Sequence, residues 1–148
     1  MDPICIVPAG DVCGEAATWD ARASLLYWTD INRFLLHIHD PAASTTRTHM
    51  FDRPVVALSL TDRAGWILVA LGSQLILFNP QSGVREDLPP SLPGWPEVRF
   101  NDGRSDPAGN FWIGSMGNNV GPDGEALPVL DGKGTLYRYR HGHPLEIF

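Results

Sequence analysis

The stretch SLTDRAGWILVAL, residues 59–71, passes from an Asp through turn-forming residues into a run of large apolar side chains. The same order occurs twice more, in TWDARASLLYWTD (residues 18–30) and in GRSDPAGNFWIGS (residues 103–115). The corresponding residues Asp20, Asp62 and Asp106 lie 42 and 44 residues apart. A repeat of this period predicts three copies of one structural unit.

The rest of the chain favours strands over helices. Short runs of aliphatic and aromatic residues are broken by Gly, Pro, Asp and Asn, and no segment keeps a capped helical period for three turns. We therefore predict an all-β fold. Four short strands in about 40–50 residues make one propeller blade. The predicted blades lie near residues 12–51, 54–88 and 97–148 of one partial β-propeller, residues 1–148.

Three blades are fewer than the roughly 4–8 with which propellers usually close. An arc of three leaves two sheet edges and an apolar blade face open. We therefore expect about half of a ring, either a truncated product or a chain that self-associates through its open blade edges. A predicted strand at residues 4–7 would complete a last blade whose other strands are not in this chain.

Composition narrows the classes of partner. The chain has 148 residues, 43% hydrophobic and 19% charged, with a net charge of −6 and a single lysine. The absence of a basic stripe argues against nucleic acid. No apolar run approaches the roughly 20 residues of a membrane helix, and the N-terminus lacks the basic region of a secretory signal, so we expect no membrane association and a cytoplasmic location. Cys5 and Cys13 are predicted to be buried free thiols.

The repeat register points to a site. Glu15, Ala57 and Asn101 each lie five residues before the turn Asp of their repeat, on strands predicted to line the central channel. Glu and Asn oxygens suit a hard cation such as Ca²⁺ or Mg²⁺. Arg99, two residues before Asn101, should share its face of the strand and could hold a polyhydroxylated or anionic substrate. Alternatively, these polar residues only satisfy channel water and backbone groups.

These segments resemble the SMP-30/gluconolactonase/LRE-like family of six-bladed β-propellers. The resemblance rests on GEAATWDARASLLYWTDI (residues 14–31), RFNDGRSDPAGNFWIGSM (99–116) and NNVGPDGEALPVLDGKGTLYRY (118–139). It spans essentially the whole chain, and the segment 99–116 is its most specific part. The first segment departs from the family pattern because Ala16–Ala17 replaces the usual Gly/Ser–Pro after the Glu.

The resemblance implies metal-dependent hydrolysis of a sugar lactone, with one divalent ion (Ca, Zn, Mg or Mn) in the channel. It assigns Glu15 as a metal ligand and Arg99 and Asn101 as the substrate-contacting pair. Asn119 would be a further substrate contact, at a place where some members carry a Glu. The remaining ligands, an Asn and the Asp expected to be the general base, would lie beyond Phe148.

Three functional hypotheses follow from these observations. The first is a gluconolactonase-like enzyme, a carboxylic ester hydrolase, of which this chain supplies the first half and which has little or no activity alone. The second is a non-catalytic propeller that serves as a binding or scaffold module. The third is a homodimer of half-propellers, in which two copies of Glu15 and Asn101 surround one two-fold axis.

Overall fold

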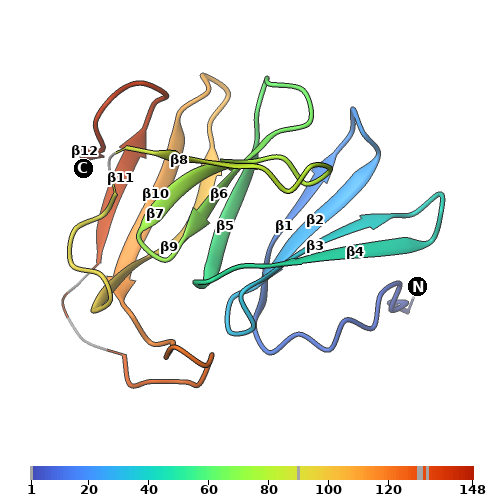
Figure 1. Cartoon of the computed structure of the whole chain (residues 1–148), viewed down its shortest axis with the longest axis horizontal. Helices are drawn as coiled ribbons and strands as arrows, with labels where there is room; N and C mark the ends of the chain where they lie inside the picture. The colour runs from blue at the N-terminus through green and yellow to red at the C-terminus, as the bar shows by residue number, and fades with distance from the viewer. Residues whose placement is uncertain (1, 90, 130–131, 133) are drawn as a thin grey trace.

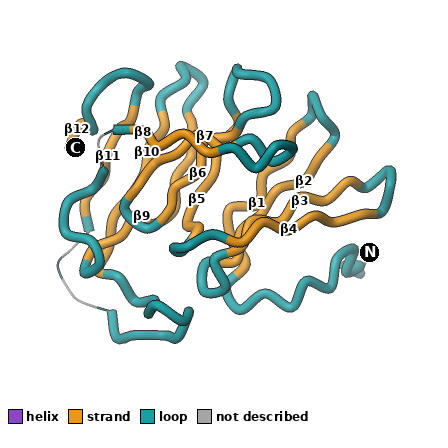
Figure 2. Tube along the Cα trace, in the orientation of Figure 1, coloured by secondary structure: helices purple, strands orange, loops and turns teal. Residues whose placement is uncertain are grey.

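A computed structural model describes residues 2–89, 91–129, 132 and 134–148. Within these residues the chain forms twelve strands, arranged as three four-stranded antiparallel sheets, and no helix (Figures 1 and 2). The described part therefore contains no helix long and apolar enough to cross a membrane. The predicted all-β propeller architecture is confirmed.

Each sheet is built from four consecutive strands joined by short turns. The first sheet contains β1 (Gly14–Asp20), β2 (Leu25–Asp30), β3 (Leu35–Asp40) and β4 (Thr45–Met50). The second contains β5 (Val55–Leu60), β6 (Ile67–Leu71), β7 (Gln74–Phe78) and β8 (Arg85–Leu88). The third contains β9 (Val98–Ser105), β10 (Phe111–Gly117), β11 (Thr135–Tyr139) and β12 (Glu146–Ile147).

The first strand of each sheet lies on the inner side of the arc. β5 packs against both β1 and β9, which places the three inner strands next to one another (Figure 1). The second sheet is apolar on both faces, and each of its neighbours covers one of them. One core cluster contains Val56, Ala57, Phe100 and Phe111, from the second and third sheets. The other includes Leu36 of the first sheet.

The repeated Asp closes the turn between the first two strands in two of the three sheets. The Asp20 carboxylate accepts a hydrogen bond from the backbone N–H of Arg22 at 2.9 Å. The Asp106 carboxylate accepts two backbone N–H bonds at 2.9 Å, from Ala108 and Asn110. These bonds satisfy turn amides that the sheet leaves unpaired. In the second sheet the turn is closed instead by the hydroxyl of Thr61, which donates to the carbonyl of Trp66 at 2.7 Å.

Each inner strand carries a β-bulge, where one extra residue interrupts the pairing. The bulges fall between Glu15 and Thr18, between Val55 and Ala57, and opposite the pair Ile113/Gly114. In β1 and β9 the bulge includes a residue in the left-handed region, Ala16 (φ 55°) and Asp102 (φ 46°). Both directly follow a residue of the predicted site, so each bulge sets the direction of that side chain.

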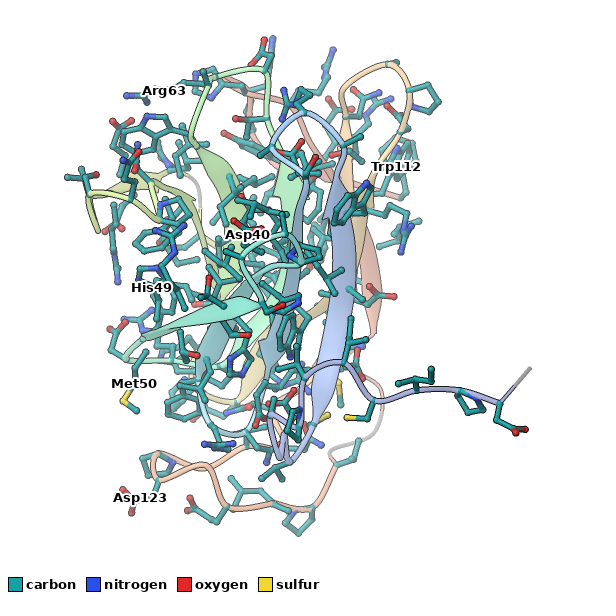
Figure 3. The ribbon with its side chains drawn as sticks, turned by 90° about the vertical axis from the view of Figure 1, so that its right-hand side faces the viewer. Asp40, His49, Met50, Arg63, Trp112 and Asp123 are labelled. Carbon is teal, nitrogen blue, oxygen red and sulfur yellow. The ribbon has the colours of Figure 1, made fainter. Side chains whose placement is uncertain are left out.

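The N-terminal residues differ from the prediction. Residues 4–7 form no strand, and Ile4 and Ile6 are 86% and 67% exposed. Figure 3 shows this segment leaving the body of the molecule. Cys5 is exposed and Cys13 half-buried, so the predicted burial of both thiols is wrong. Whether residues 4–7 complete a further blade stays a prediction.

Candidate substrate and metal site

Arg99 is the centre of a buried polar network on β9. Its side chain is only 3% exposed. One terminal nitrogen, Nη1, donates to the Asn101 side-chain oxygen at 3.0 Å and to the Phe100 carbonyl at 2.8 Å. The other, Nη2, donates to the Asn119 side-chain oxygen at 2.7 Å. The structure thus brings the three predicted substrate-binding residues into direct contact.

The backbone explains why Arg99 and Asn101 meet. They pair in regular register with Met116 and Gly114 on β10, and the bulge begins only after them. The alternation of strand side chains therefore holds between the two and places both on one face. This geometry agrees with the prediction that the two residues share a face of the strand.

Glu15 lies on β1, and its carboxylate acts electrostatically on Arg99. Burial lowers the pKa of the Arg99 guanidinium, while the charges of Cys13 and Glu15 act in the opposite direction. Burial is also the main reason that the pKa of Cys13 is raised, followed by the nearby Glu15 and Asp30 carboxylates. The Cys13 sulfur lies 4.0 Å from a Glu15 carboxylate oxygen. The negative charge of Glu15 on β1 therefore favours the charged form of Arg99 on β9.

Asp30, at the end of β2, holds the start of β1 in place. Its fully buried carboxylate accepts the backbone N–H groups of Val12 at 2.9 Å and Cys13 at 3.2 Å. It also accepts the backbone N–H of Arg33 at 3.3 Å. Because Cys13 is two residues before Glu15, Asp30 fixes the entry of the strand that presents the Glu15 carboxylate. Asp30 was not among the site residues predicted from the sequence.

Residues 118–129, here called the strap, position Asn119. The backbone carbonyl of Asn119 accepts the N–H of Leu127 at 2.8 Å, so the strap folds back on itself. Its tip reaches the first sheet, where the Asn32 side chain donates to the Gly124 carbonyl at 2.8 Å. Gly124 has φ +83°, and a Cβ atom there would meet the Asn32 carbonyl at 2.0 Å, so this contact requires glycine. The strap carries Asp123 at the lower edge of the molecule (Figure 3).

The described residues supply only part of a metal site. Glu15 provides an exposed carboxylate of the type that Ca²⁺ or Mg²⁺ prefers. No group of three or more His, Cys, Asp or Glu side chains comes close enough to hold an ion within the ranges described. The Asn101 side-chain oxygen, the other predicted donor type, already accepts from Arg99. One carboxylate does not make a site, so the residues present do not fit a bound metal without further ligands.

The predicted equivalence holds for Ala57 and Asn101 but not for Glu15. Ala57 and Asn101 pair with residues eight positions after the turn Asp of their repeats, Ala70 and Gly114, whereas Glu15 pairs with Thr29, nine positions after Asp20. The bulges also differ. In β5 the extra residue is Val56, which precedes Ala57, whereas the left-handed residues follow Glu15 and Asn101. Ala57 is fully buried in the apolar cluster between the second and third sheets. The inner strand of the second sheet is therefore packed on both faces and presents no ligand.

An apolar cavity lies under the strap. It has a volume of about 650 Å³ and apolar walls that include Phe34, Pro54, Trp95 and Leu127. None of the four predicted site residues lines it. Since a polyhydroxylated ring needs hydrogen-bonding partners, the Arg99 network suits such a ligand better than this cavity does.

The chain is similar to known proteins over most of its length. The sequence pattern of the SMP-30/Gluconolactonase/LRE-like region matches residues 13–147. The chain belongs to this family. The 6-deoxy-6-sulfogluconolactonase of Pseudomonas putida is a relative 36% identical over 112 residues, which are 76% of this chain and 38% of the relative. The putative sugar lactone lactonase YvrE of Bacillus subtilis is 29% identical over 140 residues, 95% of this chain and 48% of the relative.

Solved structures of the SMP-30/gluconolactonase/LRE-like family share the fold. A luciferin-regenerating enzyme matches with a TM-score of 0.78 at 25% identity, over 93% of this chain and 45% of that one. Regucalcin from Agrobacterium tumefaciens, described as a calcium-binding protein, matches with a TM-score of 0.75 at 26% identity, over 93% and 43%. The chain thus spans less than half the length of each of these proteins.

Proposed function

We propose that this chain forms the substrate-orienting part of a metal-dependent sugar lactonase. The observation that carries the proposal is the convergence of Arg99, Asn101 and Asn119 beside the Glu15 carboxylate. Membership of a family whose relatives include named sugar lactonases supports it. The calcium-binding regucalcin relative supports a divalent metal, and Ca, Mg, Mn and Zn are all compatible with oxygen ligands of this kind.

In this proposal, metal binding, substrate binding and positioning are assigned to different residues of the chain. Glu15 would be one ligand of the metal, which when bound would polarise the lactone carbonyl. Arg99 would donate to oxygen atoms of the substrate, and Asn101 and Asn119 would orient its ring hydroxyls. Asp30 would keep Glu15 in position through the start of β1. Further ligands and the general base would come from residues outside this chain.

Lactone hydrolysis and ligand binding test the proposal separately. Proton release from gluconolactone in the presence of each divalent metal should show little or no turnover by the 148-residue chain alone. A non-hydrolysable polyol such as D-glucitol should nevertheless bind, and Arg99→Ala should abolish its binding. Robust metal-dependent turnover by this chain would show that the site is complete, and polyol binding that ignores Arg99 would remove the proposed role of that residue.

The open edge of the third sheet favours a second candidate, the half-propeller homodimer. Leu136 and Ile147 on the last two strands, and Phe148 directly after them, are 46%, 73% and 60% exposed. Such a patch requires a covering surface, which a second copy could provide while adding a second Glu15 to the channel. A light-scattering mass of one chain would exclude this arrangement. A non-catalytic binding module, the remaining alternative, would show no metal affinity in titration.

A further inference from the structure

Arg99 is a buried cation whose hydrogen bonds all go to uncharged groups. Its three acceptors are one backbone carbonyl and two side-chain amides, from Phe100, Asn101 and Asn119. The ion pairs of the described residues do not include Arg99. Its Nε–H group is buried and has no acceptor among the described residues. The guanidinium therefore has both a free charge and a free donor.

A buried charge without a counterion is costly, because the protein interior replaces its hydration poorly. Proteins keep such a group when a ligand supplies the opposite charge. Guanidinium is the side chain best suited to this, since its fixed N–H donors match carboxylate, sulfonate or phosphate oxygens two at a time. The unused Nε–H of Arg99 is one of these donors.

Glu15 does not pair with this charge. Its carboxylate acts on Arg99 electrostatically, but none of the ion pairs among the described residues joins the two side chains. Asn119 is the side chain that touches Nη2 directly, and it is neutral. A carboxylate at position 119 would neutralise the guanidinium, whereas the amide leaves its charge for the ligand.

We infer that Asn119 makes this site selective for lactones that carry an anionic substituent, such as a sulfonate or a carboxylate, which Arg99 binds through its free N–H donors. The lactone part of this inference rests on the proposed function, but the anion site does not. Asn101, which accepts a hydrogen bond from Arg99, is half-buried, and Glu15 is exposed. Asn119 is thus a specificity-determining residue.

Binding to the full 148-residue chain tests the inference. The two probes are D-glucitol and 6-deoxy-6-sulfo-D-glucitol, which differ in charge and cannot be hydrolysed as lactones. Titration calorimetry should give at least about tenfold tighter binding of the sulfonate, since a hydrogen bond to a charged group contributes about 1.5–3 kcal/mol. The Nε–H resonance of Arg99 in ¹⁵N NMR spectra should shift with the sulfonate and much less with the polyol.

Asn119→Asp and Asn118→Asp form a matched pair of variants. Both add one negative charge, but Asn118 bonds to the backbone of Val120 rather than to Arg99. Asn119→Asp should remove the preference for the sulfonate, and Asn118→Asp should keep most of it. Equal binding of the two probes by the unmodified chain, no binding of either, or equal effects of the two variants would overturn the inference.

The two proposals fail in different ways. Sulfonate binding at Arg99 without hydrolysis of any lactone by a complete enzyme would contradict the proposed function and leave the anion site standing. Efficient hydrolysis of neutral lactones, with no gain from an anionic substituent, would contradict the anion site alone.

Discussion

The inner strands β5 and β9 lie side by side and have the same place in their sheets, yet they bury different kinds of side chain. Every residue of β5 from Val55 to Ser59 is buried, and all but the last are apolar. β9 buries Phe100 beside the charged side chain of Arg99. One strand thus holds the sheets together, while the other uses alternate positions for packing and for a polar network. The blade tolerates this difference because strand side chains alternate between two faces.

The largest effect should come from the packing position that β9 shares with β5. Phe100 is fully buried and contacts Tyr137 edge-to-face. Phe100→Ala should lower the free energy of unfolding by about 3–5 kcal/mol, because the surrounding side chains cannot fully fill the cavity that the ring leaves. Urea denaturation measures this loss. Leu136→Ala, at a half-exposed position of the same sheet, is the control and should cost far less. A similar cost for both variants would contradict the assignment of Phe100 to the core.

The second-largest loss of stability should come from replacing Asp30, which holds the start of β1 in place. Asp30→Ala leaves the N–H groups of Val12 and Cys13 without their acceptor and should cost about 2–3 kcal/mol. Asp40→Ala is the matched control, since Asp40 accepts two N–H bonds in an exposed turn. Thermal unfolding of the two variants should separate them clearly. Equal losses would show that Asp30 acts only as a turn residue.

Arg99→Leu would make β9 resemble β5 and should separate stability from binding. The variant removes a desolvated cation, so the free energy of unfolding should stay within about 1 kcal/mol or rise. Ligand binding should be lost, because the donors to the substrate are gone. Denaturation and calorimetry on the same variant test the two parts. A loss of stability as large as that of Phe100→Ala would mean that Arg99 is structural.

The smallest effect should be a pH dependence at the turn of the third sheet. Hydrogen bonds from the Asn110 amide and the Trp112 indole, with two backbone N–H bonds, lower the pKa of Asp106 to about 2. A lowered folded-state pKa means that its stabilising contribution is present above the unfolded value of about 3.9 and is lost as pH falls toward 2. In Asp106→Asn this dependence should vanish, as unfolding curves between pH 2 and 5 would show. A variant with the unchanged acid profile would contradict it.

Much of the fold could be predicted because its signals are local. The repeated turns and the apolar strand runs mark the three sheets, and alternation alone places Arg99 beside Asn101. The bulges were not predictable, because their left-handed residues Ala16 and Asp102 are not glycines. The bulge of β1 also moves Glu15 by one pairing position from the place that Ala57 and Asn101 share. The strand pairings reveal this shift. The number of residues between each position and its turn Asp does not, because it is five in every repeat.

The supports of the site were missed for a different reason. Asp30 looks like an ordinary residue at a strand end, and its bonds go to backbone groups 17 and 18 residues away. The contact of Asn32 with Gly124 spans 92 residues and depends on how the three sheets are placed. Such partners have no signature within a sequence window. The one available signal was Gly124 itself, in a turn that needs a positive φ.

The strap also alters how the molecule can come apart. In a repeat protein each unit normally touches only its neighbours, so opening one end leaves the other end intact. Here the third sheet is bonded to the first across the second through Asn32 and Gly124. Amide hydrogen exchange in the first sheet should therefore report on the opening of the third. The hydrogen bond between Asn32 and Gly124 therefore predicts that the arc opens as one cooperative unit.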